Sequence, residues 1–254
     1  MTNVIDLTGS RAGAQTGPAS APNPVLRVEG LEVTYYTDLG RAKALDDVSF
    51  TLEAGQKLGM VGESGSGKST LALAMMRMIK PPGRIEGGKV IVGGGDLMSL
   101  NDEGMRKARL SRIAYIPQGA MNSLNPVMRI GAQMVDAVKS HVQRESRSSI
   151  EDRCAHALRS VDLDPGVFKM FAHELSGGMK QRVCIAIGIL MQPSVIIADE
   201  PTSALDVVTQ RQVMETIDKV QDEINAAVIL ILGSLALINM GLDELANPRV
   251  RRTE

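Results

Sequence analysis

The stretch GESGSGKST, residues 62–70, has the residue types and the spacing of a phosphate-binding loop. Its glycines let the backbone turn tightly enough to aim N–H groups at phosphate oxygens. In such a loop Lys68 reaches the β- and γ-phosphates of a nucleotide, and the Ser69 hydroxyl binds Mg²⁺. The residues predicted to contact the nucleotide are Gly62, Glu63, Ser64, Gly65, Ser66, Gly67, Lys68, Ser69 and Thr70.

Two adjacent carboxylates, Asp199 and Glu200, follow an apolar run in SVIIADEPTSALD, residues 194–206. A buried aliphatic strand tolerates them only at its carboxyl end, where ligands bind in α/β sheets. We therefore expect Asp199 to hold Mg²⁺, directly or through water, and Glu200 to polarise an attacking water. The alternative, a pair of solvated loop acids, does not explain why they follow a phosphate loop at the spacing of one inserted subdomain.

A third stretch, LSGGMKQ at residues 175–181, predicts a helix that begins at Ser176. The serine caps this helix, and Gly177 and Gly178 leave its first amides open to an anion. Taken alone, the pattern is equally typical of a well-capped helix without a ligand.

The segments around these stretches alternate between strands and helices, which predicts a mainly parallel, buried sheet with helices on both faces. Buried strands are expected at 57–61, 195–199 and 228–232, further strands at 89–92 and 112–116, and helices at 69–79, 130–142, 150–161 and 207–224. Alternating patterns at 25–36 and 46–52 predict a small antiparallel sheet beside the nucleotide. The predicted organisation is a flexible leader at 1–24, an ordered domain at 25–245 with a helical subdomain inserted at about 100–176, and a polar tail at 246–254.

Composition excludes several classes of protein. With 28 basic and 29 acidic residues, the chain lacks the broad basic surface of a nucleic-acid-binding protein. Cys154 and Cys184 are too few for a disulfide framework or a four-ligand metal site, so we expect each to be buried and reduced. No secretory signal is recognised, which predicts a cytoplasmic protein. The uncharged run at 226–242 is interpreted as a buried strand, a turn and a short apolar segment rather than a membrane span.

With Gln118, the three stretches stand in the order found in the ATP-binding subunit of ABC transporters, which the chain resembles over about residues 25–232. The resemblance implies a P-loop NTPase core, ATPase activity with ATP and Mg²⁺ as cofactors, and a place at the cytoplasmic face of the cell membrane. It also implies a head-to-tail dimer, homomeric or heteromeric, in which LSGGMKQ of one chain closes over ATP on the other. The residues then expected to face a partner's nucleotide are Ser176, Gly177, Gly178 and Gln181.

The same resemblance assigns roles to single positions. Tyr35 stands where the family places an aromatic residue that stacks on adenine, although Tyr36 is the neighbouring possibility and a core strand aromatic is another. Gln118 matches a residue that touches Mg²⁺ and water and senses the membrane subunit. Asp206 matches an acidic position in the loop that crosses the dimer interface. The implied Mg²⁺ ligands are Ser69, Gln118 and Asp199, and the implied catalytic residues are Glu200 and Gln118.

The segment PQGAMNSLNPVMRIGAQM around Gln118, together with HELSGGMKQRV and IADEPTSALDV, is similar to the corresponding sequences of the oligopeptide, dipeptide and nickel importer group. This implies partner permease subunits in the membrane, indirectly an extracytoplasmic solute-binding protein, and no nucleic acid. Two alternatives stay open: a soluble ABC-type ATPase in repair or translation, and a non-catalytic subunit that binds ATP while its partner hydrolyses it.

Two features depart from the family pattern. The strand after the helix that follows Glu200 should lead into a His that contacts the γ-phosphate, but Gly233 stands at that position. The three histidines of the chain lie upstream, at His141, His156 and His173. The chain also ends at Glu254 after a polar stretch, which we interpret as a C-terminal shortening. We therefore expect competent binding of Mg·ATP and slow hydrolysis at this chain's own site.

Overall fold

The computed structural model describes residues 2–6, 24–38, 40–142, 144–203, 205–233 and 250–252. A six-stranded parallel sheet contains, in spatial order, β10 (Val250–Arg252), β1 (Thr2–Asp6), β4 (Lys57–Val61), β9 (Ala227–Ile231), β8 (Val195–Asp199) and β7 (Ile113–Ile116). A four-stranded antiparallel sheet contains β3 (Gly40–Leu52), β2 (Leu26–Thr37), β5 (Gly83–Val92) and β6 (Gly95–Asp96). The predicted α/β class, with a parallel core sheet and a separate antiparallel sheet, is confirmed.

Six α-helices of the described part connect and cover these sheets: α1 (Lys68–Met75), α2 (Asp102–Ala108), α3 (Ile130–Lys139), α4 (Arg147–Ser160), α5 (Gly177–Ile189) and α6 (Val207–Ile224). Short 3-10 helices are η1 (Ala120–Asn122), η2 (Pro165–Lys169) and η3 (Ala172–Glu174). Helix α6 begins and ends at the predicted residues. Helix α1 ends four residues before the prediction, since Arg77 adopts a left-handed φ of 48°.

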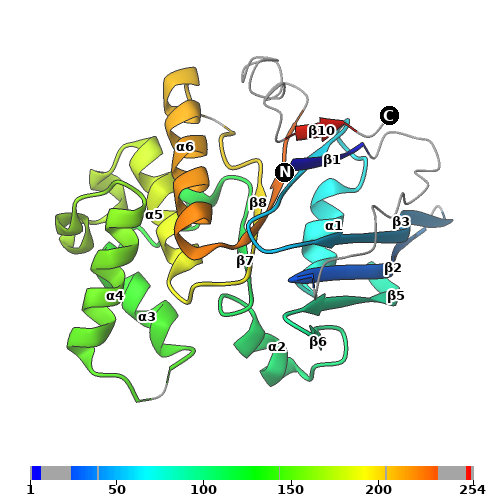
Figure 1. Cartoon of the computed structure of the whole chain (residues 1–254), viewed down its shortest axis with the longest axis horizontal. Helices are drawn as coiled ribbons and strands as arrows, with labels where there is room; N and C mark the ends of the chain where they lie inside the picture. The colour runs from blue at the N-terminus through cyan, green and yellow to red at the C-terminus, as the bar shows by residue number, and fades with distance from the viewer. Residues whose placement is uncertain are drawn as a thin grey trace.

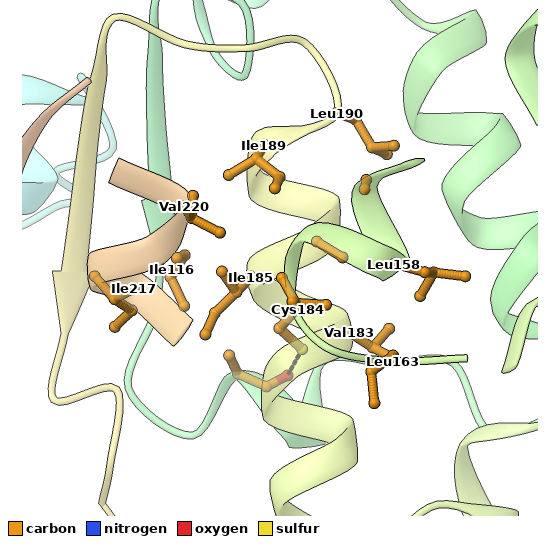
Figure 2. Close-up of a cluster of buried hydrophobic side chains, with 14 of the residues drawn as sticks. Ile116, Leu158, Leu163, Val183, Cys184, Ile185, Ile189, Leu190, Ile217 and Val220 are labelled. Atoms are coloured by element: carbon orange, nitrogen blue, oxygen red, sulfur yellow. Dashed lines mark hydrogen bonds between the residues drawn. The ribbon is translucent and has the colours of Figure 1, made fainter. Parts of the chain in front are cut away.

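The parallel sheet separates two apolar clusters, because successive side chains of a strand point to opposite faces. Along β8, Val195 and Ile197 pack with α1 and the antiparallel sheet, whereas Ile196 and Ala198 pack with α4, α5 and α6. Figure 1 shows helices α3 to α6 gathered on one side of the molecule and the antiparallel sheet on the other. In Figure 2, side chains from β7, α4, α5 and α6 meet in the second cluster, among them Ile116, Leu158, Ile185 and Ile217. The loops of the candidate site follow the strands of this parallel sheet, so the sheet fixes their positions.

The structure corrects the predicted boundaries in two places. Strand β1 lies within the predicted flexible leader, where it pairs in parallel with β4 from Thr2↔Lys57 to Asp6↔Val61. This strand is not evident from the sequence, because TNVID has only two apolar residues and its partner strand lies about 55 residues away. The predicted helical insertion at about 100–176 contains the strand predicted at 112–116, and this strand, β7, pairs with β8 in the core sheet. It also contains α2, whose Met105 and Ala108 belong to the same apolar cluster as α1.

The uncharged run at 226–242 is described only in part. Its predicted strand is confirmed as β9, in which all five residues are buried. The turn and apolar segment predicted after it lie outside the described residues, whereas β10 lies in the predicted polar tail. No helix in the described part of the chain is long and apolar enough to cross a membrane.

Candidate functional site

The carboxyl ends of β4, β8 and β9 meet at one edge of the parallel sheet. Backbone hydrogen bonds continue the pairing past the strand ends: the Leu232 N–H donates to the Met60 carbonyl at 3.0 Å, and the Glu200 N–H to the Ile231 carbonyl at 2.9 Å. The residues that follow these strands therefore leave the sheet side by side, which is where ligands bind in open α/β sheets. The structure thus brings the phosphate-loop stretch, the two carboxylates and position 233 together.

The phosphate-loop stretch has the backbone that its glycines predict. Gly65 and Gly67 have φ values of 85° and 93°, in the left-handed region that favours glycine. A Cβ on Gly67 would also lie 2.8 Å from the Ala44 carbonyl oxygen, so a side chain has no room there. Gly67 is the N-cap of α1, and no side chain caps the first amides of this helix. Uncapped amides at a helix N-terminus are suited to an anion.

The Lys68 ammonium lies inside this loop with a buried side chain, 7% exposed. It donates to the carbonyl oxygens of Gly62 and Glu63, both at 2.7 Å, and to Ser66 Oγ at 3.3 Å. All three acceptors are neutral oxygens. A buried charge without a counter-charge is costly, so the loop fits an anionic ligand such as a phosphate group.

Asp199 is the buried acid of the pair, 2% exposed. Its Oδ1 accepts a hydrogen bond from Ser69 Oγ at 3.2 Å, and its Oδ2 accepts one from the Tyr115 hydroxyl at 3.0 Å. No group of three or more His, Cys, Asp or Glu side chains suited to a metal occurs among residues the structure describes. Mg²⁺ prefers one or two protein oxygens together with phosphate and water oxygens, so the Ser69 hydroxyl and the Asp199 carboxylate fit it.

Glu200 is held in a turn with a left-handed φ of 45°. Such strain in a residue without a glycine's freedom is common at functional sites. Glu200 Oε2 accepts a hydrogen bond from Gln118 Nε2 at 2.6 Å, and a Cβ added to Gly233 would lie 3.1 Å from Glu200 Oε1. The predicted catalytic pair is therefore in contact, and the Glu200 carboxylate lies next to the position where the family has a His. Gln118 contacts this acid rather than Asp199 or Ser69, so its role as a Mg²⁺ ligand stays a prediction.

The LSGGMKQ stretch starts α5 as predicted, with the exposed Ser176 as N-cap accepting from the Met179 N–H at 3.3 Å. Gln181, however, is 2% exposed, so its side chain does not reach a surface that a partner could cover. It follows Gly178 by three residues and therefore lies on the same buried helix face. Because α5 packs on the opposite side of the sheet from α1, this stretch does not close over the phosphate loop of its own chain.

Gly178 has a packing role that can be tested. A Cβ at this position would lie 2.5 Å from Thr209 Cγ2, at the start of α6. We expect Gly178→Ala to lower the free energy of unfolding by about 1 to 3 kcal/mol, as overpacking does. Adding Thr209→Ser removes the methyl group but keeps the hydroxyl that donates to Asp206, so the double variant should recover most of the loss. Urea unfolding measures both variants, and equal losses with and without Thr209→Ser would contradict this packing.

Asp206 caps α6 on an exposed stretch of the surface. Its carboxylate accepts from the Thr209 hydroxyl at 2.6 Å and from the Thr209 N–H at 3.0 Å. These hydrogen bonds, the hydroxyl first, hold the pKa of Asp206 below its usual value. The next two residues, Val207 and Val208, are 60% and 68% exposed.

The two candidate adenine-stacking residues have different surroundings. The Tyr35 ring lies against Gly83 and packs on the core around α1, which matches the core aromatic raised as an alternative. The Tyr36 ring has two guanidinium groups near it, those of Arg41 and Arg84, each 5.3 Å from its centroid. Adenine stacking on Tyr35 stays a prediction.

Both cysteines are free and buried, as expected. Burial raises the pKa of the Cys154 thiol to about 11 and that of the Cys184 thiol to about 12. Cys184 donates to the Ala120 carbonyl at 3.2 Å, the contact drawn as a dashed line in Figure 2. Neither thiol is a nucleophile at neutral pH, because only the thiolate reacts.

Tyr115 is the site residue that the sequence patterns missed. It lies in the strand IAYI of β7, between aliphatic residues, and its hydroxyl reaches Asp199. The available signal was a polar-tipped aromatic in an otherwise aliphatic strand. The burial of this ring, followed by the nearby Asp199 charge, raises the pKa of Tyr115, so its hydroxyl stays protonated and acts as a donor.

Comparisons with known proteins agree with this geometry. A family model described as "ABC transporter" matches residues 45–203. The chain is 39% identical over 223 residues to the dipeptide transport ATP-binding protein DppD of Caldanaerobacter subterraneus subsp. tengcongensis, covering 87% of this chain and 68% of the relative. It is 40% identical over 216 residues to the oligopeptide transport ATP-binding protein OppD of Escherichia coli, covering 84% of this chain and 64% of the relative. The chain thus spans about two thirds of the length of these relatives.

Solved structures show the same fold. A dimeric post-hydrolysis state of the ATP-binding cassette MJ0796, bound to ADP and Pi, matches with a TM-score of 0.69 and 25% identity over 81% of this chain and 87% of that one. The protein cbiO1 from Clostridium perfringens, part of the ABC transporter complex cbiONQ, matches with a TM-score of 0.71 and 25% identity, covering 84% of this chain and 80% of that one. With the family match over more than half of its residues, the chain belongs to the ABC transporter family.

Proposed function

We propose that this chain binds Mg·ATP and hydrolyses it as the ATP-binding subunit of an importer of peptides or similar small solutes. The observation that carries the proposal is the Lys68 ammonium, which is buried among neutral oxygens at the edge where Ser69 contacts Asp199. Phosphate oxygens are the acceptors best suited to such a cation and to the uncapped N–H groups of α1, which donate.

The chain's own residues divide the work of phosphoryl transfer, which is mainly positioning and electrostatic stabilisation. Bound Mg·ATP supplies the phosphoryl group and the charge neutralisation it needs. Lys68 donates to phosphate oxygens, and the Ser69 hydroxyl and the Asp199 carboxylate hold the ion. Glu200 accepts the proton of the attacking water, and Gln118 keeps that carboxylate in place through the contact at 2.6 Å.

The surface around α5 and α6 supports the proposed head-to-tail dimer. The Ser176 cap is exposed, and Asp206 is followed by the exposed apolar pair Val207 and Val208. An exposed apolar pair beside the N-terminus of α5, which is suited to an anion, fits an interface with a second ATP-binding chain. That chain is either a second copy of this one or a different subunit. The relatives are named as peptide-transport ATP-binding proteins, and the solved cassette is dimeric, which supports a dimer that works in transport. The proposal adds membrane permeases as partners at the cytoplasmic face and, indirectly, an extracytoplasmic solute-binding protein.

The test of this function is co-purification with the permease subunits, followed by an ATPase assay. We expect the ATPase rate of the assembled complex to rise when a peptide-loaded solute-binding protein is added. A chain that hydrolyses ATP at the same rate with and without permeases would point instead to a soluble ABC-type ATPase.

A second candidate function is a subunit that binds ATP with slow turnover at its own site. The observation that favours it is Gly233, whose missing side chain leaves the Glu200 carboxylate without a neighbouring imidazole. Losing one transition-state donor of this kind corresponds to about 10² to 10³ in rate. The intact pair of Glu200 and Gln118 argues that turnover is reduced rather than abolished.

Restoring the imidazole tests this second candidate. We expect Gly233→His to raise the ATPase rate by about tenfold, which is less than the rate effect of one transition-state donor. The gain is smaller because Glu200 Oε1 would lie 3.1 Å from the new Cβ and must move by a few tenths of an ångström. Gly233→Ala is the matched control, because it adds the Cβ without the imidazole and should give no gain. A rate for Gly233→His at or below that of Gly233→Ala would remove the idea.

A further inference from the structure

The Asp199 carboxylate is held by two hydroxyl groups that come from different elements. Ser69 on α1 donates to Oδ1 at 3.2 Å, and Tyr115 on β7 donates to Oδ2 at 3.0 Å. Strands β7 and β8 pair in parallel, with Tyr115 opposite Ile197 and Ile116 opposite Ala198. The phenol therefore extends along the strand direction to reach the acid at the end of its neighbour.

These two contacts have different consequences for a bound ion. A carboxyl group turns easily about its last torsion, and hydrogen bonds from both sides fix its plane. Hydrogen bonds to a charged group are the strong ones, all the more at a site that is 2% exposed. Ser69 is itself a proposed ligand of the ion, whereas the Tyr115 hydroxyl contacts only the second oxygen of Asp199. Its contribution is orientation.

The segment that carries Tyr115 also reaches the neighbouring acid. Gln118 follows three residues later, and its Nε2 donates to the Glu200 carboxylate at 2.6 Å. Tyr115 donates in the same way to the Asp199 carboxylate, at 3.0 Å. One short segment, residues 115–118, therefore contacts both acids. The Tyr115 ring is packed against the apolar cluster around α1, and this packing fixes the position of its hydroxyl.

We infer that Tyr115 is a positioning residue: its hydroxyl orients the Asp199 carboxylate toward Ser69 and so sets the affinity of this site for the divalent cation that accompanies the nucleotide. The inference rests on the proposed function, because it concerns the same site. Outer contacts that orient a metal-binding side chain typically change metal affinity by about 10- to 100-fold when they are removed.

The Tyr115→Phe variant tests the inference by a binding measurement. ATP affinity is measured with Mg²⁺ and with EDTA, and Mn²⁺ binding to the ATP complex is followed by electron paramagnetic resonance. We expect metal-dependent ATP affinity and Mn²⁺ affinity to fall by about tenfold, and ATP affinity in EDTA to stay at the wild-type value. Ser160→Ala is the matched control, since it removes another buried hydroxyl that donates to a carboxylate, that of Glu223, and should leave all three values unchanged.

A double-mutant cycle with Asp199→Asn separates orientation from packing. If Tyr115 acts through Asp199, then Tyr115→Phe should cause no further loss of metal dependence in the Asp199→Asn background. The inference is overturned if Tyr115→Phe keeps wild-type metal dependence, if it weakens ATP binding equally in Mg²⁺ and EDTA, or if the two losses add. A wild-type chain that does not bind Mg·ATP would instead contradict the proposed function itself.

Discussion

We expect the Glu200→Gln variant to lose at least about 10²-fold in ATPase rate while it still binds ATP, because a general base contributes about that much or more. Glutamine has nearly the same shape and can still accept from Gln118 Nε2, which lies 2.6 Å from the Glu200 carboxylate. It cannot take a proton from water. Steady-state phosphate release and equilibrium ATP binding, measured on the same preparation, separate the two effects.

Glu215→Gln is the matched control for this loss. Glu215 forms an exposed i,i+4 pair with Arg211 on α6, and exposed pairs of this kind contribute little to stability. It should therefore keep the wild-type rate. Unchanged phosphate release by Glu200→Gln would show that another group, or the partner chain, provides the base.

Removing the cation of the phosphate loop is expected to have the largest effect on binding. We expect Lys68→Ala to weaken ATP affinity by about 10²-fold, since hydrogen bonds to charged groups are worth roughly twice neutral ones and the ammonium makes several. The variant also leaves the Gly62 and Glu63 carbonyls without their present donor. Calorimetric titration with ATP in the presence of Mg²⁺ measures the change.

Lys219→Ala serves as the control for charge alone. Lys219 pairs with Asp162 on the exposed face of α6, with a side chain that is 48% exposed. Its loss removes one positive charge without touching the loop, so ATP affinity should stay at the wild-type value. Equal affinities of wild type and Lys68→Ala would mean that this loop does not hold the nucleotide's phosphates.

The parts of the site that were predictable are those that a continuous stretch encodes. The loop at 62–70 has its strand before it and α1 after it, because the apolar run and the glycines lie next to one another in the chain. The place of Asp199 and Glu200 followed from the rule that an aliphatic strand tolerates charge only at its end. The cap at Ser176 is likewise a local pattern.

The parts that were missed depend on contacts between distant segments. Tyr115 reaches Asp199 across 84 positions of sequence, and a polar-tipped aromatic in an aliphatic strand does not say which distant residue it contacts. Strand β1 and the burial of Gln181 have the same cause, since pairing across the sheet and packing of a helix face are set by tertiary structure rather than by local propensity. Gly178 is a further example, because a Cβ there would lie 2.5 Å from Thr209 Cγ2, a contact that the local pattern does not reveal. Its role at a partner's nucleotide stays a prediction.

The proposal that this chain binds Mg·ATP through the loop at 62–70 is tested most directly by equilibrium binding of labelled ATP to the wild-type chain with Mg²⁺, followed by phosphate release from the same sample. We expect saturable binding that depends on Mg²⁺ and on Lys68, with slow phosphate release that Gly233→His accelerates. Absence of saturable ATP binding in Mg²⁺ by the folded chain would contradict it.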